Sequence, residues 1–385
     1  MKSNFPIHKF QNLETPFYYY DTALLRKTLN VAQSEADKYG YLIHYAGKAN
    51  TNPKLLRIIC EAGMGMDCVS GGEVELAMKS GFSAEKVVFA GVGKTDAEIN
   101  LALDCNIFCF NAESAPELEI INELAGKKGK VANVAIRVNP NVDAYTHRKI
   151  TTGLSENKFG INIEMLPEVI QFTNRLNDLK ISGLHFHVGS QITDLSVFEN
   201  LCVRINELQD ELKSKLNMTV EHINVGGGLG VNYEHPNHLS IPDFEAYFRV
   251  FNKYLKLRAG QELHCELGRS IVAQCGTLIS RVIFVKEATT KKFAILDAGF
   301  TDLLRPAMYD SYHRIENLTS DEPCELYDVV GPICESSDVF GKDRELTRVH
   351  RGDLIAIRSA GAYGEVMTSQ YNLRRLPQAY LSEEL

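Results

Sequence analysis

The sequence lacks the features that mark secreted, membrane-spanning and nucleic-acid-binding proteins. Its first residues, MKSNFPIHKFQ, contain no apolar stretch like that of a signal peptide. No run of about 18 or more apolar residues occurs, so we expect no membrane-spanning helix. Charges of both signs are mixed, the formal net charge is −8, and no long basic run is present, which argues against nucleic acid as a partner. We therefore expect a cytoplasmic protein.

Cysteine and metal motifs are also missing. The chain has nine cysteines but no CxxC pair. Four of them lie inside apolar runs: Cys68, Cys105, Cys109 and Cys265. This pattern favours reduced, buried thiols. His185 and His187 stand two residues apart, but no other ligand follows at a spacing typical of a metal site, so we expect no metal.

Length and composition predict two domains. The chain has 385 residues, 44% of them hydrophobic, and single cores stop growing near roughly 250–300 residues. Between residues 41 and 268 one unit recurs, in which a short apolar run is followed by a loop and an amphipathic stretch. The eight runs span residues 41–48, 64–70, 87–92, 106–112, 133–139, 181–188, 222–228 and 262–268. Such runs are typical of parallel strands buried on both faces.

The stretches between these runs have helical periodicity. In the segment 52–63, four apolar residues fall on one face: Leu55, Leu56, Ile59 and Cys60. Alternating strands and helices predict a parallel sheet with right-handed crossovers. Eight such units match the count of a (β/α)8 barrel of the TIM type. An open, doubly wound sheet is the structural alternative.

The pattern changes after residue 270. The apolar runs there are separated by turns and loops, and they span residues 276–288, 293–299, 324–331 and 353–363. This pattern predicts an antiparallel β domain, and the strand-like run 17–21 is expected to join it. We therefore expect a barrel over residues 25–270 and a β-sandwich or barrel-like domain from residues 1–24 and 271–385.

Polar side chains and glycines follow five of the eight runs at corresponding positions. They are Lys48 after the first run, Asp67 and Glu73 at the second, His187 and Ser190 at the sixth, Gly226, Gly227 and Gly228 at the seventh, and Glu266, Gly268 and Arg269 at the eighth. A barrel gathers the carboxyl ends of its strands at one rim, where such enzymes have their active sites. The coincidence predicts one shared site.

Two of these features have an ordinary structural interpretation as well. Lys48 taken alone is a solvated strand-end lysine, yet its run is apolar up to Ala46. A desolvated amine has a lowered pKa and can form a Schiff base. The glycines at 226–228 form either a plain turn or an amide cradle for an anion. They match the dinucleotide fingerprint poorly, which argues against a nicotinamide cofactor.

Glu266 lies within the apolar stretch 263–268, where an unpaired carboxylate would be costly. We therefore expect a partner for it. A carboxylate beside a pyridine nitrogen keeps that nitrogen protonated and makes the ring an electron sink. This favours reactions that pass through a stabilised carbanion, such as the loss of CO2.

The motifs together resemble those of the fold-type III pyridoxal-phosphate decarboxylases. The matching segments are HYAGKAN at 44–50, HFHVGSQ at 185–191, NVGGGLG at 224–230 and ELGRS at 266–270. Within that family, GPICESSDVF at 331–340, DLLRPAMYDSYH at 302–313 and GAYG at 361–364 are similar to the diaminopimelate decarboxylases. The family usually has proline at the position of Leu267, and its loss leaves Glu266 and Arg269 in place.

The resemblance implies a role for each matched residue. Lys48 would bind pyridoxal 5′-phosphate covalently, His187 would stack on its ring and Glu266 would pair with its nitrogen, while Asp67 and Glu73 would support the lysine and the histidine. The phosphate would be held by Ser190, Gly226, Gly227, Gly228, Gly268, Arg269 and Tyr363. The retained carboxylate would be bound by Arg269, Arg305 and Tyr309, with Tyr363 beside them, and Glu335 would take the distal amine.

Cys334 is implied to be the proton donor. In the family, Cys334 and Glu335 reach the active site of the partner subunit, so the resemblance also implies a homodimer. The implied reaction is the decarboxylation of meso-diaminopimelate to lysine, the last step of lysine biosynthesis. Ornithine or arginine would leave Arg269 and Arg305 unmatched, because neither has a distal carboxylate.

Three other classes of protein are alternatives on this scaffold. Alanine racemase-like enzymes have an arginine at the pyridine nitrogen, so Glu266 speaks against them, whereas a polyamine-pathway enzyme such as carboxynorspermidine decarboxylase needs a substrate assay to separate. A non-catalytic cofactor-binding protein would resemble the barrel alone.

The polar segment 141–160, with Gly153 and Gly160, is a hypothetical lid over the site.

Overall fold

The computed structural model describes residues 5–141 and 158–385. The chain divides into two compact units. The barrel unit comprises Leu29–Gly230 and Asp243–Gly268, and the β unit comprises Met1–Thr28, Val231–Pro242 and Arg269–Leu385. Most of the proposed lid at 141–160 lies outside the described residues. The segment Val231–Pro242, which the sequence analysis assigned to the barrel, groups here with the β unit.

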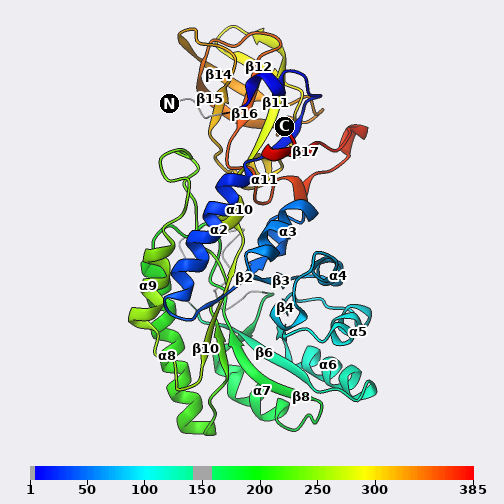
Figure 1. The fold of residues 1–385 in the computed structure, drawn as a ribbon, viewed down its shortest axis with the longest axis vertical. Coiled ribbons are helices and arrows are strands. Elements are labelled where there is room, and N and C mark those ends of the chain that lie inside the picture. The colour runs from blue at the N-terminus through cyan, green and yellow to red at the C-terminus, as the bar shows by residue number, and fades with distance from the viewer. Residues whose placement is uncertain (1–4, 142–157) are drawn as a thin grey trace. The chain divides into compact units, whose positions relative to one another are not determined.

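The barrel unit closes eight parallel strands into a ring (Figure 1). In chain order they are β2 (Leu42–Ala46), β3 (Gly65–Cys68), β4 (Val87–Phe89), β5 (Cys109–Ala112), β6 (Ala132–Asn139), β8 (Leu179–His185), β9 (His222–Asn224) and β10 (Glu262–Leu267). Each strand pairs with the next, and β10 returns to β2, where Glu266 lies opposite His44. The predicted barrel is confirmed, and the open sheet is excluded.

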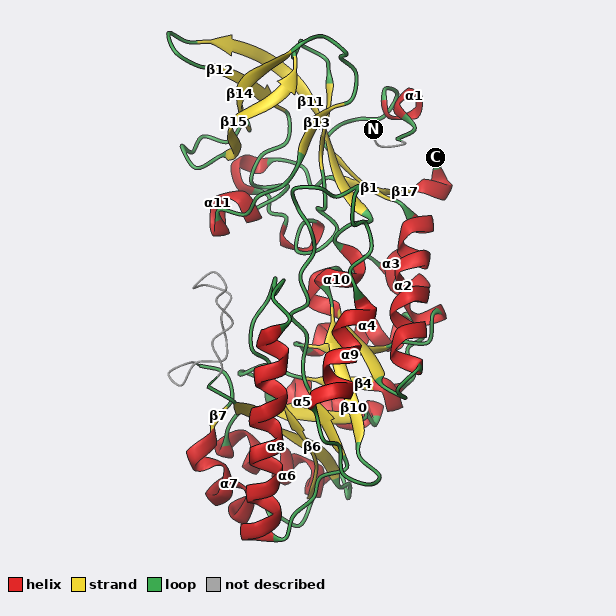
Figure 2. Cartoon of the chain, turned by 90° about the vertical axis from the view of Figure 1, so that its left-hand side faces the viewer, coloured by secondary structure: helices red, strands yellow, loops and turns green. Residues whose placement is uncertain are grey.

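One helix, α2, precedes the first barrel strand, and seven more connect successive strands; α6, α7 and α8 cover the outside of the ring in Figure 2. The eight are α2 (Thr22–Asp37), α3 (Pro53–Glu61), α4 (Gly71–Lys79), α5 (Asp96–Cys105), α6 (Ala115–Lys127), α7 (Leu166–Thr173), α8 (Ser196–Leu216) and α9 (Phe244–Tyr254). Within the described part of the chain, no helix combines the length and apolarity needed to cross a bilayer.

Local sequence explains where several of these helices begin. The side chains of Asn52, Ser70 and Ser114 each accept a hydrogen bond from a backbone amide of the first turn that follows. Thr95 and Glu98 form a reciprocal capping box at the start of α5. Because each cap satisfies amides that would otherwise lack partners, the chain leaves the strand and enters the helix at a defined residue.

Four strands were not predicted, three of them in the β unit: β13 (Ile315–Asn317), β15 (Val339–Thr347) and β17 (Gln378–Leu381). The fourth, the two-residue strand β7 (Ile161–Asn162), pairs with the end of β6 outside the ring. Two residues are too few to show the alternation by which strands are recognised in a sequence.

The β unit contains a second sheet. Its strands are β1 (Phe17–Tyr20), β11 (Gly276–Glu287), β12 (Lys292–Leu296), β13 (Ile315–Asn317), β14 (Cys324–Val330), β15 (Val339–Thr347), β16 (Leu354–Ile357) and β17 (Gln378–Leu381). The predicted run at 17–21 joins this sheet as β1. Three short helices accompany it: α1 (Ile7–Phe10), α10 (Arg269–Val272) and α11 (Arg305–Tyr309).

This second sheet is mixed, which corrects the prediction of an antiparallel domain. Most pairings are antiparallel, but β12 pairs in parallel with β14, and β1 pairs in parallel with β17. Parallel neighbours require a long connection. The 27 residues between β12 and β14 provide one. Such a crossover needs about a dozen residues or more. The strands β1 and β17 come from opposite ends of the chain.

A buried aromatic and imidazole cluster lies inside the barrel unit. The ring centroids of His264 and His222 are 4.9 Å apart. The ring of Phe108 stacks on that of His264, with their centroids 5.3 Å apart. His44 Nδ1 lies 3.0 Å from the Lys86 carbonyl, which can only accept, so this nitrogen carries the proton. His44 Nε2 therefore accepts from His264 Nδ1 at 2.8 Å. This pair of hydrogen bonds requires a neutral imidazole at His44.

Burial is the main reason that these imidazoles stay neutral. It lowers the pKa of His222 to about 4 and that of His264 to about 2, and the neighbouring His44 adds to both shifts. A Cβ at Gly183 would lie 2.2 Å from His222 Nε2, so a glycine is needed for the ring to fit.

We predict that this cluster makes the fold sensitive to acid. The pKa of His222 is lower in the folded state than in the unfolded state, so its contribution to stability is complete above pH 6.5 and is lost towards pH 4. The loss is about 3 kcal/mol for His222. His222→Phe keeps an aromatic ring and should flatten this part of the curve of urea midpoint against pH. The exposed His238→Phe is the control, and identical curves for both variants would contradict the prediction.

Candidate functional site

The predicted lysine lies directly after the first barrel strand. Lys48 is in the short 3-10 turn Gly47–Ala49 that follows β2, and its side chain is 37% exposed. Its Nζ lies 3.4 Å from Oδ2 of Asp67, a fully buried residue at the end of β3. Glu73 accepts a hydrogen bond from the Val69 amide at 2.8 Å. A Cβ at Gly268 would lie 3.0 Å from that of Ala49, so the end of β10 packs closely on this turn.

Asp67 is protonated at neutral pH. Burial raises the pKa of Asp67 to about 8, the negative charge of Glu266 adds to the shift, and Lys48 counteracts it. Its Oδ1 is buried without a hydrogen-bond partner among the described residues. The side chain beside the lysine therefore holds a proton and has one oxygen available to a further group.

Glu266 is held by donors from three other strands. Its Oε1 accepts hydrogen bonds from Asn111 Nδ2 at 2.9 Å and Asn224 Nδ2 at 2.8 Å. His185 Nε2 lies 3.0 Å from Oε2. Burial alone would raise the pKa of Glu266, but His185 and Lys48 outweigh burial and hold that pKa well below its usual range. Glu266 is therefore a buried carboxylate that stays ionised, and the partner expected for it is a set of three donors.

The orientation of His187 follows from a hydrogen bond with the neighbouring glycine loop. The Gly227 amide donates to His187 Nδ1 at 3.2 Å, so that nitrogen carries no proton. Burial, followed by Lys48 and Arg137, lowers the pKa of His187 well below its ordinary value. His187 is therefore a neutral ring with its proton on Nε2, as suits stacking on a flat partner.

The glycine run at the end of β9 is required by close packing. A Cβ at Gly227 would lie 2.0 Å from the Glu266 carbonyl, and one at Gly228 would lie 2.7 Å from the Gly189 carbonyl. Gly226 and Gly228 also have positive φ angles of 68° and 113°. Ser190 directly follows Gly189 on the neighbouring loop. These glycines provide an amide cradle that any side chain would fill, and such a cradle suits a phosphate.

The described barrel residues fit a pyridoxal group. They include an accessible amine at Lys48, a neutral histidine ring, a permanently ionised carboxylate at Glu266 and the glycine cradle. The unpartnered Oδ1 of Asp67 is a further polar contact for a ligand. No group of three or more histidine, cysteine, aspartate or glutamate side chains among the described residues is arranged to hold a metal ion.

The β unit has a separate, positively charged cluster. Arg269 and Arg305 are both buried, at 4% and 6% exposed. The Tyr363 ring lies 4.9 Å from Arg269 Cζ and 5.7 Å from Arg305 Cζ, and Tyr309 lies 5.6 Å from the latter. Tyr233 accepts a hydrogen bond from Arg269 at 2.6 Å. Buried guanidinium groups in an aromatic setting are suited to binding a carboxylate.

Cys334 and Glu335 lie on an exposed loop of the β unit. The Cys334 amide donates to Asn372 Oδ1 at 3.1 Å, and Glu335 accepts from the Tyr371 hydroxyl at 2.7 Å. The base of the loop is held by buried Asp338, which accepts the Ile333 amide at 2.7 Å. The thiol and the carboxylate are thus fixed by their backbone while remaining accessible.

Sequence reasoning did not identify several of these residues. Asn111, His185, Asn224 and Tyr233 were not proposed for the site. His185 had a usable signal, because residues two apart on a strand point to the same side and His187 was already a candidate. Asn111 and Asn224 lie on β5 and β9, and only closure of the ring brings them to Glu266.

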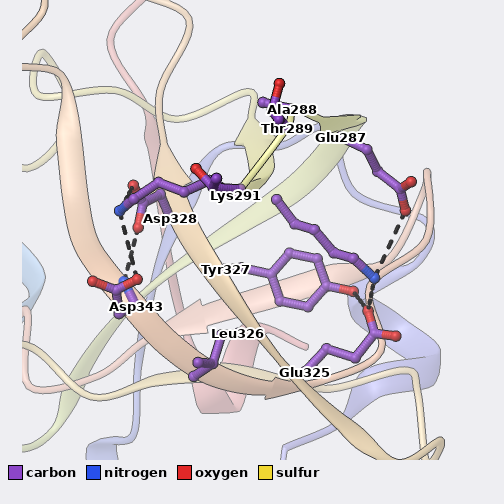
Figure 3. Close-up of a pocket in the computed structure, with 11 residues that line it drawn as sticks. Glu287, Ala288, Thr289, Lys291, Glu325, Leu326, Tyr327, Asp328 and Asp343 are labelled. Carbon is purple, nitrogen blue, oxygen red and sulfur yellow. Dashed lines mark hydrogen bonds and ion pairs between the residues drawn. The ribbon is translucent and has the colours of Figure 1, made fainter.

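A pocket of about 430 Å³ in the β unit is not a second active site (Figure 3). Lys291 pairs with Asp328 at 2.8 Å, and Lys292 pairs with Glu325 at 2.7 Å. Figure 3 shows the pair of Lys291 with Asp328 and the Tyr327 hydroxyl, which donates to Glu325. Each lysine in the pocket is neutralised by a neighbour, so the pocket offers no excess charge to a ligand.

We predict that Asp67→Asn removes a pH dependence. The pKa of Asp67 is higher in the folded state than in the unfolded state, so its contribution to stability is complete near pH 4 and is lost as pH rises through 8. Between pH 6 and pH 9 the wild type should lose about 3 kcal/mol relative to the variant, as measured by urea denaturation. Parallel stability curves would contradict a protonated Asp67.

Comparison with known proteins identifies the family. Residues 23–273 match the family model described as "Pyridoxal-dependent decarboxylase, pyridoxal binding domain". The chain is 62% identical to diaminopimelate decarboxylase of Bacteroides thetaiotaomicron, with 100% of both chains covered. It is 43% identical to the same enzyme of Neisseria meningitidis, covering 94% of this chain and 86% of that one.

Solved structures agree with this assignment. Diaminopimelate decarboxylase from Helicobacter pylori, complexed with L-lysine, matches with a TM-score of 0.92 and 38% identity over 98% of this chain and 94% of that one. A lysine/ornithine decarboxylase from Vibrio vulnificus, at 22% identity, a TM-score of 0.86 and full coverage of both chains, shows the same fold. From its family model, its full-length relatives and its fold, the chain belongs to the diaminopimelate decarboxylases, a family of pyridoxal-dependent decarboxylases.

Proposed function

We propose that this protein decarboxylates meso-2,6-diaminopimelate to L-lysine and CO2, the last step of lysine biosynthesis, with pyridoxal 5′-phosphate as cofactor. The observation that carries the proposal is Glu266, a carboxylate buried on the barrel strand β10 whose pKa is held well below its usual range. A carboxylate in such a place has a function only beside a cation, and the protonated pyridine nitrogen is the cation that this family's cofactor provides.

The barrel residues hold the cofactor. Lys48 would bind it covalently, His187 would stack on its ring through a neutral imidazole, and Asp67 would present its proton-bearing carboxyl beside the lysine. The amides of Gly226, Gly227 and Gly228, with Ser190, receive the phosphate, and Gly268, Arg269 and Tyr363 complete its surroundings. When bound, pyridoxal phosphate supplies an electron sink for the carbanion that is left after CO2 departs.

The residues of this chain determine which proton goes where. Asn111, Asn224 and His185 hold Glu266 ionised, so Glu266 keeps the ring nitrogen protonated. Cys334 donates a proton to the carbon that has lost CO2. Its thiol is exposed, as a proton donor that must be replenished from solvent requires.

The arginine cluster recognises the carboxylate that is retained. Arg269, Arg305 and Tyr309 bind it, and Glu335 binds the amine at the same end of the substrate. A monocarboxylate amino acid such as ornithine leaves these buried guanidinium groups without an anion, which costs binding energy. This favours a diamino-dicarboxylate over the polyamine precursors.

We predict that Lys48→Ala abolishes cofactor attachment. Borohydride reduction followed by peptide mapping should label position 48 in the wild type and nothing in the variant, and the absorbance band of the bound cofactor should disappear. Lys54→Ala, an exposed lysine on α3, is the matched control and should keep both signals. A label at any other lysine would contradict the assignment.

We predict CO2 release from meso-diaminopimelate by the wild type. Arg305→Met should raise KM for this substrate by about 10- to 100-fold, because a charge-assisted hydrogen bond contributes about 1.5–3 kcal/mol. CO2 release from a different amino acid, with none from meso-diaminopimelate, would overturn the substrate assignment and leave the reaction type intact.

We further propose a homodimer in which Cys334 and Glu335 serve the partner's active site. Lys48→Ala and Cys334→Ala, each nearly inactive alone, should regain about a quarter of wild-type activity when their subunits are mixed and exchanged. Half of the dimers are then hybrids, each with one intact site. Activity that stays at the level of the single variants would show that the sites are not shared.

A further inference from the structure

Tyr233 contacts both arginines of the cationic cluster. It lies on the segment Val231–Pro242, which groups with the β unit although it is inserted between barrel elements. Arg269 Nη1 donates a hydrogen bond to its hydroxyl at 2.6 Å. Its ring centroid is 6.0 Å from Cζ of Arg269 and 6.0 Å from Cζ of Arg305. One tyrosine thus restrains two guanidinium groups, one of them through its hydroxyl.

No carboxylate of the described residues forms an ion pair with Arg305, the second guanidinium group that Tyr233 contacts. Arg305 is buried, and within residues 5–141 and 158–385 its one hydrogen-bond partner is the hydroxyl of Ser311, at 3.1 Å. A buried guanidinium group with no carboxylate beside it is costly. An incoming anion would compensate this buried positive charge and would bind more tightly for that reason, provided that the guanidinium groups stay in position.

The ring of His313 packs against the ring of Tyr233. The two rings meet edge to face with centroids 5.0 Å apart. His313 is fully buried, and its Nδ1 lies 2.8 Å from the Arg358 carbonyl, which can only accept, so Nδ1 carries the proton. Burial, with Arg305 second, lowers the pKa of His313 to about 3. The imidazole is neutral at working pH and adds no third positive charge.

We propose that Tyr233, backed by His313, is a positioning residue that holds Arg269 and Arg305 for the retained carboxylate and so sets the preference for substrates that carry one. The hydroxyl fixes the direction of the Arg269 fork, and the ring face limits the movement of both side chains. This inference rests on the proposed function, since it takes the anion at the arginines to be the substrate's retained carboxylate.

Two small molecules isolate that carboxylate. L-lysine carries it, and 1,5-diaminopentane is the same molecule without it. With holoenzyme, titration calorimetry gives a dissociation constant for each. Tyr233→Phe keeps the ring and removes only the hydroxyl. The expected result is an affinity for L-lysine about tenfold weaker, with the affinity for 1,5-diaminopentane unchanged. In catalysis, KM for meso-diaminopimelate should rise while kcat stays close to wild type.

Tyr312→Phe is the matched control, because Tyr312 packs on Arg344 at 4.3 Å on the same loop as His313. It should leave both affinities unchanged. Tyr233→Leu, which also removes the ring, should weaken L-lysine binding further, and the Phe variant decides alone if the Leu variant does not fold. Melting temperature and bound cofactor should be the same for Tyr233→Phe as for wild type.

Two results would overturn the inference, and they differ. If wild type prefers L-lysine but Tyr233→Phe keeps that preference or weakens both ligands alike, Tyr233 does not position the arginines and the proposed function stands. If wild type itself binds the two ligands equally, the carboxylate assignment of Arg269 and Arg305 fails together with this inference.

Discussion

The arrangement of the barrel site depends on one buried carboxylate. Glu266 could not remain ionised in the barrel interior without its hydrogen-bond donors, because burial alone would protonate it. Asn111, His185 and Asn224 supply those donors from β5, β8 and β9. The carboxylate and its donors thus come from four strands, so closure of the ring is what makes the ionised state possible.

The two units carry opposite electrostatic features. The barrel unit holds a negative charge, suited to a protonated ring nitrogen, and places a proton-bearing Asp67 near it. Two carboxyl groups in related surroundings thus have pKa values moved in opposite directions, which separates their roles. The β unit holds two buried guanidinium groups among tyrosines, suited to a carboxylate.

Close backbone packing supports the same chemistry. The glycines after β9 lie so near the Glu266 and Gly189 carbonyls that no side chain fits. Because the Gly227 amide also donates to His187, the cradle and the stacking ring are oriented by one contact. The neutrality of His187 is therefore a consequence of packing as much as of burial.

Strand and helix order could be predicted because each element carries its own pattern. The eight barrel strands recur as short apolar runs, and the helices between them have periodic apolar faces and side chains that cap their first turns. The strand β7 escaped prediction since two residues show no alternation. The parallel pairs β1–β17 and β12–β14 escaped it because pairing between distant segments leaves no local signal.

The candidate site also has a part that the sequence predicts and a part that depends on the tertiary structure. Lys48, His187, Glu266 and the glycine run stand at strand ends in recognisable motifs, so the sequence alone determined the family and the principal candidate residues. Only the tertiary structure decided which protonation states they adopt and which side chains support them. Those properties depend on burial and on partners such as Asn224 and Tyr233, which come together through folding and not through proximity along the chain.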